Sequence, residues 1–137
     1  MAEGLFRFFI LQMGQAWRIG SAGVYAQPGY PAAEYTLEIL RDHGVDLSAH
    51  RSRLITADLI EQYQLALTME QGHKEALLAA FPNQIGKVFL LSEMTGKFRD
   101  IVDPIGRDYL DYLDTAREIK GIFSSGFNRI ATLAEDD

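Results

Sequence analysis

A pair of short apolar runs separated by a helical segment most constrains how this chain can fold. We expect buried strands at Leu65–Met69 and Lys87–Leu91, because each is a short apolar run typical of parallel sheets. Between them, Gln71–Phe81 has the character of a helix and stops before Pro82. Strands that alternate with helices indicate a parallel sheet covered on both faces. In such folds, ligands bind beyond the carboxyl ends of the strands.

The rest of the chain is expected to continue this alternation. Further helices are predicted over Ala2–Gln15, Ala32–His43, Thr56–Tyr63 and Asp108–Phe123, and a short strand over Trp17–Ala22. Thr56 suits an N-cap position and Gly44 a position just after a helix. We expect Gly121 and Gly126 to weaken the far end of the last helix. Its inner face is predicted to consist of Leu110, Leu113, Ile119 and Ile122.

Composition limits the class of protein. The 137 residues suit one domain spanning 1–137, and 47% of them are apolar, enough for a buried core. A net charge of −6 disfavours nucleic acid or an anionic membrane as the main partner. No stretch is long and apolar enough to cross a bilayer, so we expect a cytoplasmic protein. With no cysteine, the sequence offers neither disulfides nor a thiolate metal site.

Six segments occur in the order and at about the spacing of a known family. They are Met1–Phe6, Ser21–Gly23, Gly44–Leu47, His50–Ser52, Leu65–Met69 and Val102–Pro104. Together they resemble the low-molecular-weight protein phosphatases, which include protein-tyrosine phosphatases, bacterial protein-arginine phosphatases and thioredoxin-linked arsenate reductases. The resemblance covers almost the whole chain and is nearest to the arginine-phosphatase-like members. It implies a three-layer, Rossmann-like α/β fold around a four-stranded parallel sheet.

The family signature, a Cys-x-x-x-x-x-Arg-Ser loop after the first strand, has no counterpart here. In the family, backbone N–H groups of that loop surround the phosphate and lower the cysteine pKa, and the arginine binds two phosphoryl oxygens. Relatives usually continue the loop as Pro-Met-Ala-Glu, so we expect an N-terminal truncation directly before Met1. Two explanations are consistent with this expectation: a mis-assigned start, which we favour, and a true truncation. Either would remove the central first strand, the nucleophile and the phosphate-binding arginine together.

Asp103 is the best candidate for a catalytic residue. By resemblance, the aspartate of the Asp103-Pro104 pair protonates the leaving group and then activates water to hydrolyse a phosphocysteine. Pro104 restrains the backbone of Asp103 to an extended conformation, which helps to aim its carboxylate. Ser21 resembles a serine that supports the phosphate loop, although a local strand-end role is equally consistent with its position.

Tyr25 and Ile105 correspond to positions that form the walls of the family's substrate cleft. Tyrosine phosphatases of the family tend to carry aromatic residues directly after the Asp-Pro pair, whereas this chain has Ile105 and Gly106. This difference weakens a phosphotyrosine assignment and brings the pattern closer to arginine phosphatases. The substrate class therefore stays open between phosphotyrosine and phosphoarginine.

Three functions follow from the resemblance. The first is a phosphoprotein phosphatase that needs no metal or other cofactor and is expected to be inactive in this cysteine-free chain. The second is a non-catalytic, phosphatase-like binding or regulatory protein. The third, arsenate reductase, is disfavoured because thioredoxin-linked members need further cysteines after the loop.

Other polar residues are expected to be structural. We predict no metal site, because His43, His50 and His73 are scattered, although His50 lies in a matching segment and could support the site. Arg51 and Arg53 could form a phosphate clamp, but solvated arginines beside a helix are more common. Loss of the central strand would expose sheet edges, through which the chain could form homodimers or aggregates. We expect the first helix to persist rather than to replace that strand.

Overall fold

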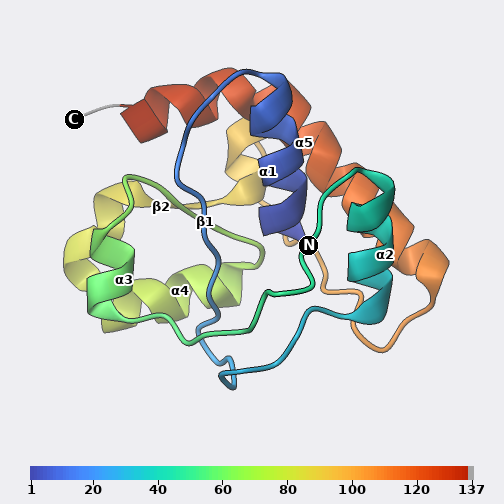
Figure 1. Ribbon diagram of the computed structural model, residues 1–137. Coiled ribbons are helices and arrows are strands. Elements are labelled where there is room, and N and C mark those ends of the chain that lie inside the picture. Colours follow the sequence, from blue (N-terminus) through green and yellow to red (C-terminus); the bar gives the residue numbers. More distant parts are fainter. Residues whose placement is uncertain (136–137) are drawn as a thin grey trace.

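The computed structural model describes residues 1–135 and shows helices on both sides of a small sheet (Figure 1). The α-helices are α1 (Ala2–Gln12), α2 (Glu34–Asp42), α3 (Ala57–Glu61), α4 (Gln71–Ala80) and α5 (Tyr109–Glu135). The strands are β1 (Ala66–Thr68) and β2 (Val88–Leu90), and the 3₁₀ helices are η1 (Pro82–Lys87) and η2 (Leu91–Thr95). Within the described residues, no helix is both long and apolar enough to span a membrane.

The two predicted central strands are confirmed. β1 and β2 run parallel, with Leu67 opposite Phe89, and α4 makes the crossover between them. Leu67 and Phe89 pack against the core that α1 and α5 share, whereas Ala66 and Val88 pack against the core beside α3 and α4. Figure 1 shows the same division, with α3 and α4 on one side of the strands and α1, α2 and α5 on the other. The predicted α/β fold with a parallel sheet covered on both faces is therefore correct.

The prediction of a regular strand at Trp17–Ala22 is wrong for this structure. Within residues 1–135 the segment has no ladder partner, and the nearest β contact is a single parallel bridge between Gly23 and Leu54. A strand exists only when a neighbour receives its backbone hydrogen bonds, and none lies beside this segment. The segment is held by side chains instead: the Trp17 ring stacks on Phe127 at 5.6 Å between centroids.

The helix α5 forms one wall of the main core and departs from its prediction. It does not end near the glycines at 121 and 126 but continues from Tyr109 to Glu135. A Cβ placed on Gly126 would lie 2.8 Å from the Met94 Cβ and 2.9 Å from the Met94 carbonyl oxygen. Gly126 therefore allows α5 to lie directly on η2. Leu110 is also a correction, because it is 67% exposed rather than part of the inner face.

The other helices match their predictions to within a few residues. The Thr56 side chain accepts a hydrogen bond from the Leu59 N–H at 3.1 Å and caps α3 as expected. Gly44 follows α2 with a φ of 77°, a conformation that glycine adopts without strain. The segment after Met1 remains helical as α1, as we predicted, and it packs across α5 through Phe6 and Phe123. The helix α2 begins at Glu34, later than the predicted start at Ala32.

Candidate functional site

A cleft of about 850 Å³ separates the extended segment Trp17–Ala26 from β1. The start of α1, the loop that follows η2, and residues of α3, α4 and α5 also line it. All five site residues predicted from the sequence line this one cleft. They are Ser21, Tyr25, Asp103, Pro104 and Ile105. The fold thus brings together two segments that are far apart in the sequence.

The loop that carries Asp103 is fixed at its base. The Asp100 carboxylate accepts a hydrogen bond from the Gln71 N–H at 2.8 Å, and so caps the start of α4. The Ile101 N–H donates to the Met69 carbonyl oxygen at 2.9 Å, which ties the loop to the end of β1. Sequence analysis missed this cap, because α4 becomes the partner of Asp100 only in the folded chain.

The tip of the same loop is exposed. Asp103 lies at the surface of the cleft, and one of its oxygens accepts the Ile105 N–H at 3.0 Å. Pro104 is buried, and its carbonyl oxygen accepts the Arg107 N–H at 2.9 Å in a tight turn. A buried proline beneath an exposed carboxylate limits how the loop can move. Asp103 is therefore presented to the cleft from a restrained backbone.

A cluster of tyrosines adjoins Asp103. The Tyr112 ring is buried and packs edge-to-face against Tyr35 at 5.3 Å, and Tyr109 packs against the same ring at 5.5 Å. Burial raises the pKa of Tyr112, and the negative charge of Asp103 adds to the effect. Both tyrosines of α5 therefore pack against the Tyr35 ring.

Glu3, in α1, lines the cleft and is the centre of a group of polar contacts. It accepts hydrogen bonds from the Ser21 hydroxyl at 2.6 Å and from Arg7 Nε at 3.1 Å, and His50 Nδ1 lies 3.9 Å away. Burial by itself would raise the pKa of Glu3, but the Ser21 hydrogen bond and the Arg7 charge outweigh it and lower that pKa. Sequence analysis missed Glu3 as a site-supporting residue. The i, i+4 spacing of Glu3 and Arg7 was the only local signal.

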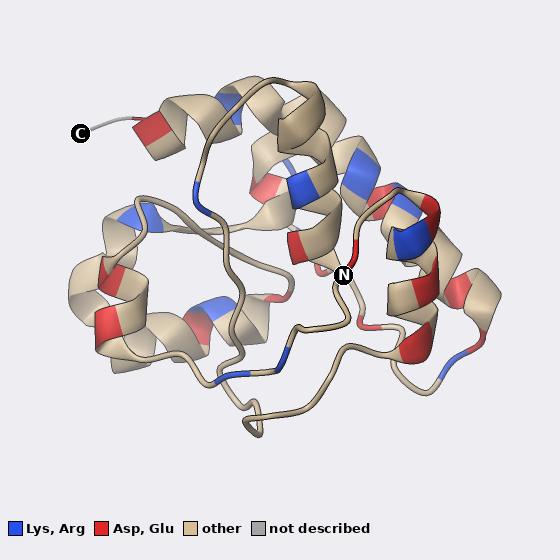
Figure 2. Ribbon diagram, in the orientation of Figure 1, with Lys and Arg blue, Asp and Glu red and all other residues tan. Residues whose placement is uncertain are grey.

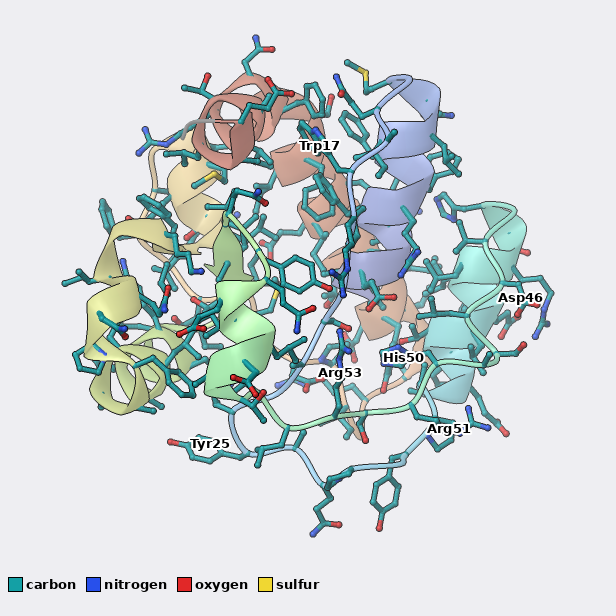
Figure 3. The ribbon with its side chains drawn as sticks, turned by 60° about the vertical axis from the view of Figure 1, so that its left-hand side comes forward. Trp17, Tyr25, Asp46, His50, Arg51 and Arg53 are labelled. Atoms are coloured by element: carbon teal, nitrogen blue, oxygen red, sulfur yellow. The ribbon has the colours of Figure 1, made fainter. Side chains whose placement is uncertain are left out.

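Two arginines considered as a phosphate clamp lie in different environments. Arg53 lines the cleft and donates from Nε to the Ser21 carbonyl oxygen at 2.9 Å, whereas Arg51 bonds to the carbonyl oxygens of Ser48 and His50. Figure 2 shows basic residues on the coil segments that run beside α1 and β1. Figure 3 shows Arg53 near the centre of the molecule and Arg51 towards α2. The structure therefore does not bring the two guanidinium groups together as a pair.

The exposed wall residues and the metal prediction complete the description of the cleft. Tyr25 is 78% exposed and points away from the body of the protein (Figure 3), and Ile105 is 73% exposed.

Among residues 1–135, no group of three His, Asp or Glu side chains is arranged to hold a metal ion. The cleft therefore presents the exposed carboxylate of Asp103, the guanidinium groups of Arg18 and Arg53, and a largely apolar lining.

These features define a parallel α/β protein with a cleft beside its strands. A family model described as low molecular weight phosphotyrosine protein phosphatase matches residues 1–135. The chain belongs to this family.

Relatives in the family include both tyrosine and arginine phosphatases. The chain is 34% identical over 113 residues to a probable low molecular weight protein-tyrosine-phosphatase, EpsP, of Ralstonia solanacearum, covering 82% of this chain and 77% of the relative. It is also 34% identical over 121 residues to a protein-arginine-phosphatase of Bacillus subtilis, covering 88% and 80%.

A solved structure of the YwlE arginine phosphatase is similar in three dimensions. It is a cysteine-to-serine mutant with a phosphorylated active-site serine. The TM-score is 0.88 at 31% identity, and the match covers 99% of this chain and 87% of that chain. A TM-score of this size agrees with the Rossmann-like fold that the sequence resemblance implied.

Proposed function

We propose that this chain carries the general-acid and substrate-wall part of a phosphoprotein phosphatase that acts through a phosphocysteine. In this proposal, Asp103 is the general acid and base, Tyr25 and Ile105 form walls for the substrate, and Ser21 and Pro104 support the site. The supporting observation is that all five residues line one cleft. We further propose that residues 1–137 make up one domain and that the protein acts in the cytoplasm on phosphorylated proteins.

The chemistry assigns two opposite proton transfers to Asp103. In the first step, a cysteine thiolate attacks phosphorus, the bond to the leaving group breaks, and the Asp103 carboxyl gives that group its proton. In the second step, the Asp103 carboxylate accepts a proton from water as the water attacks phosphorus, which releases phosphate and regenerates the thiolate. An exposed carboxylate on a restrained loop suits both transfers, because it can reach the leaving group and then the water.

The 137-residue sequence contains no cysteine, so we propose that the chain alone does not complete this reaction. Purified protein assayed with p-nitrophenyl phosphate should show only the background rate. Turnover that disappears in Asp103→Asn would contradict the need for a cysteine in this mechanism.

A fusion tests the roles of Asp103 and the substrate walls directly. A segment carrying the family's first strand and Cys-x-x-x-x-x-Arg-Ser loop would be joined in frame before Met1. We expect the fusion to hydrolyse phosphorylated substrates and Asp103→Asn to reduce its rate by a factor of about 10² to 10⁴, the usual contribution of general acid catalysis. Asp108→Asn, a surface carboxylate beyond the cleft lining, is the matched control and should retain activity. A fusion that folds and turns over equally well without Asp103 would refute the assignment.

Phosphoarginine and phosphotyrosine peptides compared on the same fusion distinguish the two substrate classes. Ile105 in place of an aromatic residue leads us to expect a preference for phosphoarginine, because it offers no ring to stack on a phosphotyrosine. The measurement is kcat/KM for matched peptides. A preference for phosphotyrosine would refute this part of the proposal.

The absence of cysteine also supports a second candidate, a phosphatase-like protein that binds phosphorylated partners without hydrolysing them. Arg53 is the cleft residue best placed to attract a phosphate. Isothermal titration with phosphopeptides and their unphosphorylated forms tests this candidate. Equal affinity for both forms would exclude phosphate recognition by the chain alone.

A further inference from the structure

The loop that carries Tyr25 is fastened at both of its ends to the segment of chain that precedes α3. At the first end, the Gly23 N–H donates to the Arg53 carbonyl oxygen at 2.9 Å. The Ile55 N–H donates in turn to the Gly23 carbonyl oxygen at 3.0 Å. This end of the loop is therefore held by backbone groups, which do not depend on the side chains present.

Ser52 fastens the other end of the loop with both its backbone and its side chain. The Gly29 N–H donates to the Ser52 carbonyl oxygen at 2.8 Å, and the Ser52 N–H donates to the Tyr30 carbonyl oxygen at 2.7 Å. The Ser52 hydroxyl oxygen accepts the Tyr30 N–H at 2.9 Å, and the hydroxyl donates to the Gln27 carbonyl oxygen at 2.5 Å. A hydroxyl can fill both roles at once, because it has one proton to donate and two lone pairs that accept.

The Ser52 side chain acts inside a turn of this loop. Pro28 and Gly29 occupy the two central positions of the turn, and Gly29 has a φ of 92°. Proline followed by a glycine with positive φ is the pattern of a type II turn. In a closed turn of this type, the Tyr30 N–H would donate directly to the Gln27 carbonyl oxygen. Here the Ser52 hydroxyl lies between these two groups and bonds to both, so another segment of the chain closes the turn.

The position of Tyr25 depends on this anchoring, because its own side chain makes little contact. Tyr25 is 78% exposed and points away from the body of the protein (Figure 3). A freely moving loop would have to be ordered each time a ligand binds, at a cost in conformational entropy. Anchors at Gly23 and Ser52 remove much of that cost before binding takes place.

We propose that Ser52 is a positioning residue, whose hydroxyl holds the loop between Gly23 and Tyr30 as a preformed wall for the substrate. This inference rests on the proposed function, which assigns Tyr25 to the substrate wall. In the part of the chain that the structure describes, Ser52 does not line the cleft, so it acts through the loop and not by contact with substrate. Its hydroxyl therefore affects the binding of substrate and leaves the chemical step intact.

Amide hydrogen exchange of the chain itself, followed by NMR, tests the positioning. In Ser52→Ala the Tyr30 N–H loses its acceptor, and we expect it to exchange about tenfold faster. The Gly23 N–H is the internal control, because its acceptor is a backbone carbonyl that the substitution keeps. Ser52→Thr keeps a hydroxyl and should restore slow exchange at Tyr30. Unchanged exchange at Tyr30 in Ser52→Ala, or equal acceleration at both amides, would overturn the proposal.

Kinetics of the fusion that carries the Cys-x-x-x-x-x-Arg-Ser loop test the consequence for substrate binding. Ser52→Ala should raise KM for phosphopeptides about three- to tenfold and leave kcat nearly unchanged, because a wall contacts the ground state and the transition state alike. Ser52→Thr should return KM towards the unsubstituted value. Ser124→Ala removes an exposed hydroxyl of α5 outside the cleft lining and is the matched control, which should keep the unsubstituted KM.

The outcomes separate this inference from the proposed function. A folded fusion that shows no turnover before any substitution refutes the proposed function, and the wall role of the loop with it. Turnover with the same KM in Ser52→Ala and in the unsubstituted fusion overturns the role of Ser52 alone. A fall in kcat with an unchanged KM also overturns that role, because the loop would then act on the chemical step.

Discussion

Replacing Gly126 by alanine tests how closely α5 approaches η2. The new methyl group would lie 2.8 Å from the Met94 Cβ and 2.9 Å from the Met94 carbonyl oxygen, both closer than van der Waals contact. Because one of these atoms is backbone, a side-chain rotation cannot relieve the overlap. Overpacking of this kind costs about 1–3 kcal/mol, and the gain in helix propensity over glycine returns only about 1 kcal/mol. We expect Gly126→Ala to lower the free energy of unfolding by about 1 kcal/mol.

Gly121→Ala is the matched control in the same helix. No atom of the described part of the chain lies within 4 Å of the position that its Cβ would take, so only the propensity term acts. This variant should raise the free energy of unfolding by about 0.5–1 kcal/mol. Urea denaturation followed by far-ultraviolet circular dichroism measures both variants. The argument is refuted if the two alanine variants are equally stable, because they would then share the same helix gain without a packing penalty.

Three further predictions concern the hydrogen bonds that Glu3, Asp100 and Thr56 accept. Folding lowers the pKa of Glu3, so the ionised Glu3 carboxylate stabilises the folded protein at pH values above its unfolded-state pKa. That stabilisation is lost as pH falls through the folded-state pKa. Glu3→Gln should therefore reduce the fall in the free energy of unfolding between neutral and acidic pH, measured by urea denaturation. An equal fall in both proteins would contradict this prediction. Asp100→Ala removes the cap on Gln71 and should cost about 1 kcal/mol, whereas Asp103→Asn should cost clearly less by the same urea titration. Thr56→Ala should cost about 1 kcal/mol by loss of the α3 cap, and Thr56→Ser should restore most of it.

Local signals in the sequence predicted most elements well. Short apolar runs became β1 and β2, because continuous apolar character suits a strand buried on both faces. The cap at Thr56 and the turn at Gly44 were also predictable, because each depends on residues within one helical turn. By contrast, the close approach of η2 to Gly126 was not predictable, because it depends on Met94 in another element.

The candidate site was predicted only in part. The sequence motifs selected Asp103, Ser21 and Tyr25, and the fold places them along one cleft. The motifs did not show that Glu3 bonds to Ser21 or that Asp100 caps α4. Both contacts join residues that are distant in sequence, and no periodicity or spacing along the chain encodes such pairs.

The sequence by itself determined the alternation of helices and strands, the helix caps, and an ordered set of motifs sufficient to indicate the family. Each of these depends on residue type and short-range spacing. Only the tertiary structure decided that Trp17–Ala22 runs without a ladder and faces β1 across an apolar cleft. The physical reason is that a strand is defined by its neighbours: its backbone groups form a ladder only when another strand is present to receive them.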